Sequence, residues 1–131
     1  MKFAKIVFRI AGIWGFLILT PLYFLFDLTG RQSPPAITHP EFYYVFVGVA
    51  LVWQVGVLLI ASNPIRYRPF MIAAILEKLA YVIPIVILYF QHRVASNQLI
   101  FVATDFTLCL LFIASYFKTP AQPAPSSASK P

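Results

Sequence analysis

Three ionisable side chains lie inside long apolar runs of this chain, and they are the residues best suited to chemistry. Glu77 and Lys78 are adjacent in one run, and Asp105 lies in the next run. A charge in the middle of a bilayer costs about 2.5–3.5 kcal/mol on insertion scales, so each group is expected to face other helices and find a partner. A carboxyl group in such a site also suits acid–base catalysis or proton coupling.

Helical spacing predicts which of these groups meet. At 1.5 Å per residue, Glu77 lies about 12 Å, Lys78 about 13–14 Å and Asp105 about 18 Å from the same end of their helices. An offset of about 4–5 Å is within reach of a lysine side chain, so a Lys78–Asp105 ion pair is predicted. Gln54, in the preceding run, comes out level with Glu77, which predicts a polar layer containing all four residues.

Two interpretations of this polar layer remain open. In the first it is a pocket, where Glu77 or Asp105 accepts a proton and Lys78 is the charge partner. In the second, the Lys78–Asp105 pair and a Glu77–Gln54 hydrogen bond hold the helices together, as interhelical polar contacts do at about 0.6 kcal/mol each. The sequence assigns no catalytic residue, and it does not decide whether the protein is an enzyme.

The composition excludes several classes of protein. Apolar residues make up 60% of the chain and charged residues 11%, against about 45–50% and 25% in soluble domains. The net charge is +6, but the basic residues flank apolar runs rather than form a patch, which argues against nucleic-acid binding. Cys109 is the single cysteine, and His39 and His92 are far apart. We therefore predict no disulfide, no metal site and no cofactor.

Four apolar runs are long enough to cross about 30 Å of hydrocarbon, which takes about 20 helical residues. Their short connections favour antiparallel neighbours. The predicted fold is an all-α integral membrane four-helix bundle, antiparallel, over residues 1–118. Residues 119–131, rich in proline, alanine and serine, are predicted to form a disordered cytoplasmic tail. The spans are Ile6–Phe26, Phe42–Ser62, Pro69–Phe90 and Leu99–Phe117.

The positive-inside rule orients these spans. Seven basic residues flank one side, and only Arg31 and Arg93 flank the other. Both termini and the loop between the second and third spans are therefore predicted to be cytoplasmic. The seven are Lys2, Lys5, Arg9, Arg66, Arg68, Lys118 and Lys130.

The turn Asn63-Pro-Ile-Arg-Tyr-Arg-Pro69 is the most distinctive string in the chain. Asn-Pro ends the second span and Pro69 begins the third. Arg66 and Arg68 are candidates for contacts with lipid headgroups. The turn, with Glu77-Lys78 downstream, resembles a pattern in small four-helix bacterial membrane proteins of the BphX-like and DoxX-like kind. The resemblance implies a protein of the bacterial inner (plasma) membrane.

Three functions compete on this sequence, and the lipid bilayer is an expected partner in each. The first is an accessory or structural membrane protein, whose buried charges fix helix packing and whose partner is another membrane protein. The second is a binding protein or enzyme for an apolar molecule, such as a quinone, isoprenoid or sterol-like lipid, that uses the buried carboxyl groups. The third is a small proton-coupled transporter, ranked last because the first span lacks a central carboxyl group.

Overall fold

The computed structural model describes residues 2–32 and 38–123, and all regular structure in these residues is helical. Four helices are long and apolar enough to span a membrane. They are α1 (Lys2–Leu19), α3 (Pro40–Ser62), α4 (Phe70–Phe90) and α5 (Leu99–Lys118). A short helix, α2 (Phe26–Gln32), and two 3₁₀ segments, Thr20–Phe24 and Ser96–Gln98, complete the described structure.

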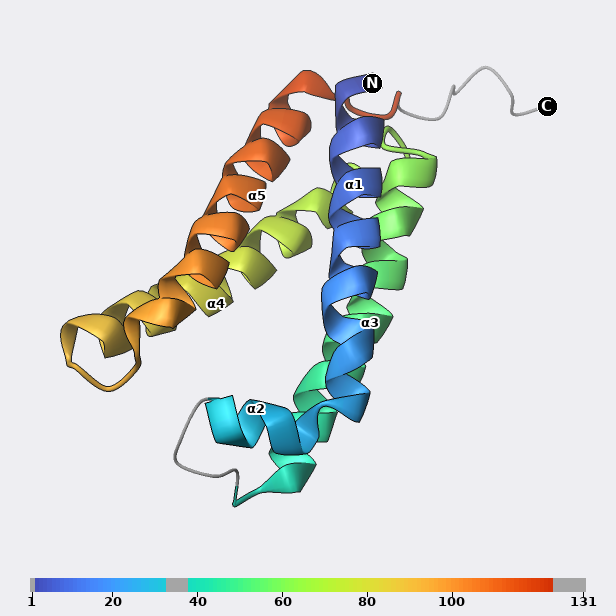
Figure 1. Ribbon diagram of the computed structural model, residues 1–131. Helices are drawn as coiled ribbons and strands as arrows, with labels where there is room; N and C mark the ends of the chain where they lie inside the picture. Colours follow the sequence, from blue (N-terminus) through green and yellow to red (C-terminus); the bar gives the residue numbers. More distant parts are fainter. Residues whose placement is uncertain (1, 33–37, 124–131) are drawn as a thin grey trace.

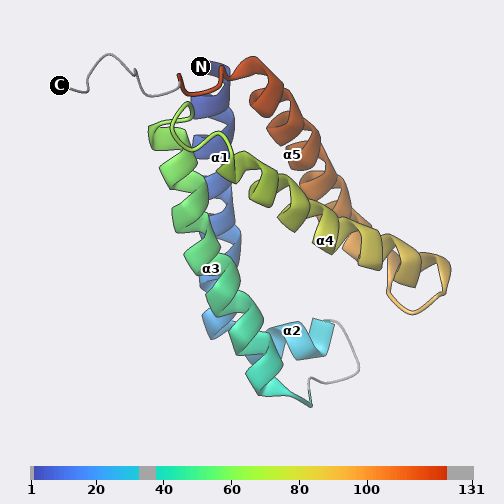
Figure 2. The same ribbon diagram turned by 180° about the vertical axis from the view of Figure 1, so that it is seen from behind.

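The four long helices form two arms that meet at one end (Figure 1). Helix α1 packs along α3, and α4 packs along α5. Helix α5 also contacts α1, whereas α3 and α4 have few contacts despite their short connection. Seen from behind, α3 and α4 diverge from their shared turn (Figure 2). The all-helical prediction is confirmed, and the divergence of the arms is a feature that span lengths do not reveal.

The core lies where the arms join. Small residues of α1, such as Ala4 and Ala11, let the other helices approach Phe8, which stacks on Phe112 of α5 with 4.4 Å between ring centroids. Ile60 of α3 and Met71 of α4 are fully buried in the same cluster. All four long helices therefore share one apolar cluster at the end that holds the N-terminus.

Pro21 explains why the first predicted span does not continue as one helix. Proline has no backbone N–H and fits the start of a helical segment. Accordingly α1 ends at Leu19 and the chain tightens into the 3₁₀ segment that contains Pro21. The hydroxyl of Tyr43 donates a 2.7 Å hydrogen bond to the Leu22 carbonyl. Phe26 packs edge-on against the Tyr43 ring at 5.1 Å, which seats α2 at the start of α3.

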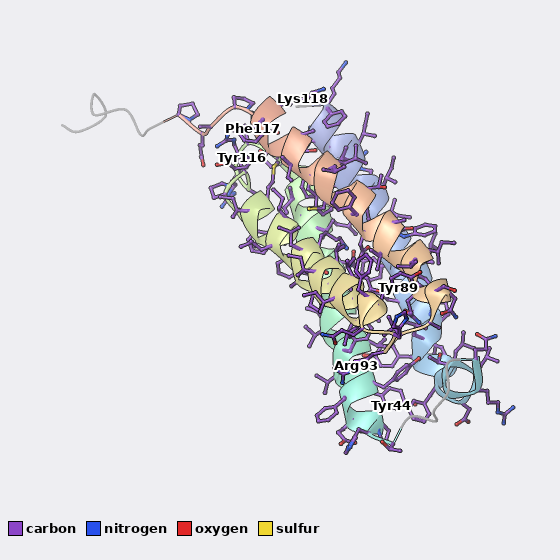
Figure 3. All side chains as sticks on the ribbon, turned by 90° about the vertical axis from the view of Figure 1, so that its left-hand side faces the viewer. Tyr44, Tyr89, Arg93, Tyr116, Phe117 and Lys118 are labelled. Carbon is purple, nitrogen blue, oxygen red and sulfur yellow. The ribbon has the colours of Figure 1, made fainter. Side chains whose placement is uncertain are left out.

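Aromatic side chains mark the ends of both arms. Tyr116, Phe117 and Lys118 lie beside the start of α1, and Tyr89, Arg93 and Tyr44 lie at the far ends of the arms (Figure 3). Large apolar side chains also point away from the protein, among them Phe24, Phe90 and Phe117, which are 83%, 74% and 77% exposed. Exposed large apolar side chains recur along all four long helices.

The predicted tail begins one residue too early. Thr119 is buried, and its hydroxyl donates a 2.7 Å hydrogen bond to the Ser115 carbonyl, so it belongs to the end of α5. The rest of the tail prediction concerns mainly residues 124–131, which lie outside the described residues.

Close packing of α1 on α3 makes Gly12 sensitive to substitution. A Cβ added there would lie 2.6 Å from Leu58 Cδ2, and one added at Gly15 would meet the Gln54 side chain. We expect Gly12→Val to lower the free energy of unfolding by about 1–3 kcal/mol through overpacking. The loss is measured by circular dichroism as dodecyl sulfate is titrated into mixed micelles. Gly56→Ala, whose Cβ would lie 3.3 Å from Phe70, is the control. An equal loss of stability in both variants would contradict the conclusion that close packing of α1 on α3 requires Gly12.

Candidate functional site

Lys78 lies between two carboxyl groups in the α4–α5 arm. Its ammonium Nζ is 3.5 Å from Oδ1 of Asp105 and 3.4 Å from Oε2 of Glu77. The ion pair predicted between Lys78 and Asp105 is therefore present, and Glu77 joins it. We call Glu77, Lys78 and Asp105 the charged triad.

Helical spacing places the triad at the α4–α5 contact. The buried residues of α4 are Met71, Ala74, Lys78 and Val82, which recur at helical spacing on one face. On α5, Asp105 lies three residues after buried Val102 and four before buried Cys109. Lys78 thus occupies a core position, and Asp105 lies on the α5 stripe that faces it.

The triad contains one ammonium for two carboxyl groups. The side chains of Lys78, Asp105 and Glu77 are 11%, 24% and 36% exposed, so Glu77 is its most open member. Oε2 of Glu77 is enclosed and faces the Lys78 ammonium at 3.4 Å without a well-aligned hydrogen bond. Lys78 divides its charge between both carboxyl groups, so the charge of Glu77 is only partly balanced within the triad.

Gln54 does not join the triad, so the predicted Glu77–Gln54 hydrogen bond is not formed. Gln54 is buried at the α1–α3 contact beside Gly15, and its Nε2 donates a 3.1 Å hydrogen bond to the Ala50 carbonyl. The prediction rested on equal depth along two helices. Equal depth did not bring the groups together because α3 and α4 diverge.

A cleft that the sequence did not predict lies between α3 and the start of α4. It has a volume of about 450 Å³. Phe70 of α4 lies 5.4 Å from the Trp53 ring of α3, measured between centroids. The indole Nε1–H of Trp53 is enclosed and has no acceptor within the described residues. The cleft is lined by Gly48, Val49, Val52, Trp53, Gly56 and Phe70.

The remaining polar candidates have simpler surroundings. Trp14 is 45% exposed on α1. Cys109 is buried, and its Sγ lies 4.0 Å from the Ile75 carbonyl. His39 makes an exposed 3.1 Å contact with Glu41. Within residues 2–32 and 38–123, no three His, Cys, Asp or Glu side chains group closely enough to hold a metal ion.

The two candidate headgroup arginines have different roles. The Nε–H of Arg68 is shared between the carbonyls of Tyr116, at 3.1 Å, and Thr119, at 2.7 Å. Its guanidinium also lies 3.9 Å from the centroid of the Tyr116 ring. Arg68 therefore satisfies carbonyls that the end of α5 leaves without helical partners. Arg66 is exposed, so a headgroup contact remains a prediction for this arginine.

Comparisons of the chain with protein-family models, with curated proteins and with solved structures find no match. The function is therefore argued from the charged triad, the cleft and the Arg68 contact.

The Arg68 contact yields a local prediction. Arg68→Ala removes the donor to both carbonyls and the contact with Tyr116, at a cost of about 1.5–3 kcal/mol. We expect backbone amides near the end of α5, around Ser115 to Thr119, to exchange with deuterium faster by about tenfold or more. Arg66→Ala is the control and should leave exchange unchanged. Equal protection in both variants would show that Arg68 does not secure α5.

Proposed function

We propose that this chain is an integral membrane accessory protein that works by packing against another membrane protein. The observation that carries the proposal is the position of Lys78, between Asp105 and Glu77 inside the α4–α5 contact. The ionisable groups join two helices of the same chain, and none of the three lines the cleft between α3 and the start of α4. The apolar faces of the diverging arms supply surface for a partner.

The membrane location and the orientation of the helices are part of the same proposal. Helices α1, α3, α4 and α5 cross the bacterial inner membrane with both termini in the cytoplasm. The seven-to-two bias of basic flanking residues supports this orientation. The position of α2 at the far end of the α1–α3 arm suits a short segment at the outer interface. A relationship to BphX-like and DoxX-like proteins also belongs to the proposal, on the strength of the Asn63–Pro69 turn.

Binding of an apolar molecule is the second candidate function, and one observation favours it. The apolar cleft holds the unpartnered indole N–H of Trp53 beside Phe70. Few well-placed polar groups in an apolar pocket are typical of small-molecule sites. It ranks second because Lys78 and Asp105 pair with each other away from the residues that line this cleft.

Substitutions in the charged triad test the accessory function. Lys78→Met leaves two carboxyl groups without a cation, and we expect it to lower the free energy of unfolding by about 3 kcal/mol. The triple variant Glu77→Gln, Lys78→Met, Asp105→Leu removes every charge and should return to within about 1 kcal/mol of the natural chain. Unfolding in mixed micelles measures both values. A harmless Lys78→Met would exclude a structural role for the triad, and exposed Lys2→Met is the control.

Cysteine labelling tests the orientation. In a Cys109→Ala background, Lys2→Cys and Ile65→Cys should react with an impermeant maleimide only after the cytoplasmic face of membrane vesicles is exposed. Asn97→Cys, between α4 and α5, should react from the opposite face. Labelling of all three positions from the same face would contradict the proposed topology.

A further inference from the structure

Glu77 is the most exposed ionisable residue of the charged triad. Its side chain is 36% exposed, whereas that of Lys78 is 11% exposed. Its nearest cation, Lys78, lies 3.4 Å from Oε2 of Glu77 and also faces Asp105 at 3.5 Å. The triad therefore presents a carboxyl group whose charge the chain balances only in part.

The cleft and Glu77 lie on the same face of α4. Phe70 forms the α4 wall of the cleft, 3.3 Å from the Cβ position of Gly56 on α3. Glu77 follows seven residues later, which is about two helical turns or 10 Å along the same face. Glu77 therefore follows the cleft along α4, on the helix that diverges from α3 beyond their shared turn (Figure 2).

The α3 wall of the cleft is apolar and partly exposed. Val49 and Val52 of α3 line the cleft and are 66% and 71% exposed. Gly48 and Gly56 of the same wall are contacted by Tyr23 and Phe70 of this chain, so Val49 and Val52 are the wall residues available to a partner. The α3 wall is apolar, and the α4 side carries one carboxyl group, Glu77. The complementary occupant is apolar along its length and carries one cation.

We propose that the cleft between α3 and the start of α4 receives a transmembrane helix of a partner protein, and that Glu77, about two turns further along α4, recognises one lysine or arginine on that helix. An ionisable group inside a membrane that lacks a full partner in its own chain is balanced most directly by an opposite charge on a neighbouring helix. This inference rests on the proposed accessory function and names the chemistry of the partner.

Within residues 2–32 and 38–123, no basic side chain other than Lys78 forms an ion pair with Glu77. In α3 and α4 the only basic residue is Lys78, which is already shared by two carboxyl groups. The other basic residues of the long helices lie in the first turns of α1 or at the end of α5. In the proposed complex, the charge complementary to Glu77 comes from the partner helix.

Model peptides in nanodiscs test this recognition. The probe is a leucine–alanine peptide of about 20 residues with one central lysine, and the reference peptide carries leucine there. A donor fluorophore is attached through Ala121→Cys in a Cys109→Ala background. Energy transfer to labelled peptide measures binding. We expect the lysine peptide to bind about tenfold more tightly than the leucine peptide.

Variants locate the binding site. Glu77→Gln should abolish the preference for lysine, and Glu77→Asp should retain it. Val49→Trp, which fills the cleft, should weaken binding of both peptides. Glu41→Gln removes an exposed carboxyl group at the start of α3 and should change nothing. Circular dichroism confirms that each variant is folded.

Several outcomes would overturn the inference. These are equal binding of both peptides, a lysine preference that survives Glu77→Gln, or a small apolar molecule that occupies the cleft stoichiometrically and excludes the peptides. A homo-oligomer dispersed by Arg9→Gln would also overturn it, because the cation would then come from a second copy. Failure of the peptide test leaves the stability of the triad variants unchanged, so it is distinguishable from failure of the accessory function.

Discussion

The arrangement of this protein depends on one apolar junction at the end where the chain begins. Phe8 stacks on Phe112, and the cluster around them draws residues from all four long helices. Away from this junction each helix keeps only one close neighbour, so the two arms share little further contact. Arg68 reinforces the same end, because it joins the turn between α3 and α4 to the last carbonyls of α5.

Each arm is held by a different kind of contact. Between α1 and α3, Gly12 and Gly15 allow close approach, and the Gln54 amide is satisfied by its own helix. Between α4 and α5, the Lys78 ammonium is the central polar contact. Ions are costly to bury singly and tolerable in compensated groups. The polar specificity of the fold is therefore concentrated in the α4–α5 arm, and the excess carboxyl group lies there too.

The divergence of the arms links packing to the proposed function. A closed bundle would cover the inner faces of α3 and α4 with the chain's own side chains. Here Val49 and Val52 are exposed, and Phe70 lines a cleft. Without a hydrophobic driving force between helices in lipid, such surfaces are joined by close packing and polar contacts. Glu77 is the polar group available for that purpose.

The sequence by itself determined the number of long helices, their approximate limits and the Lys78–Asp105 pair. These follow from apolar run length and from the rise per residue, which are properties of single helices. It missed α2 because a seven-residue helix in a turn-rich segment has little periodicity. It also assigned Arg68 to headgroups, since flanking charge indicates a side of the membrane and does not identify a hydrogen-bond acceptor.

Only the tertiary structure decided which side chains at similar depth along their helices touch one another. Glu77 and Gln54 lie at similar depth, yet they belong to different arms, because depth is one coordinate and contact requires all three. The cleft beside Trp53 has the same origin. It lies where α3 and α4 begin to diverge after their turn (Figure 2), and packing between helices joins residues from distant parts of the chain, as Phe8 and Phe112 do at the junction.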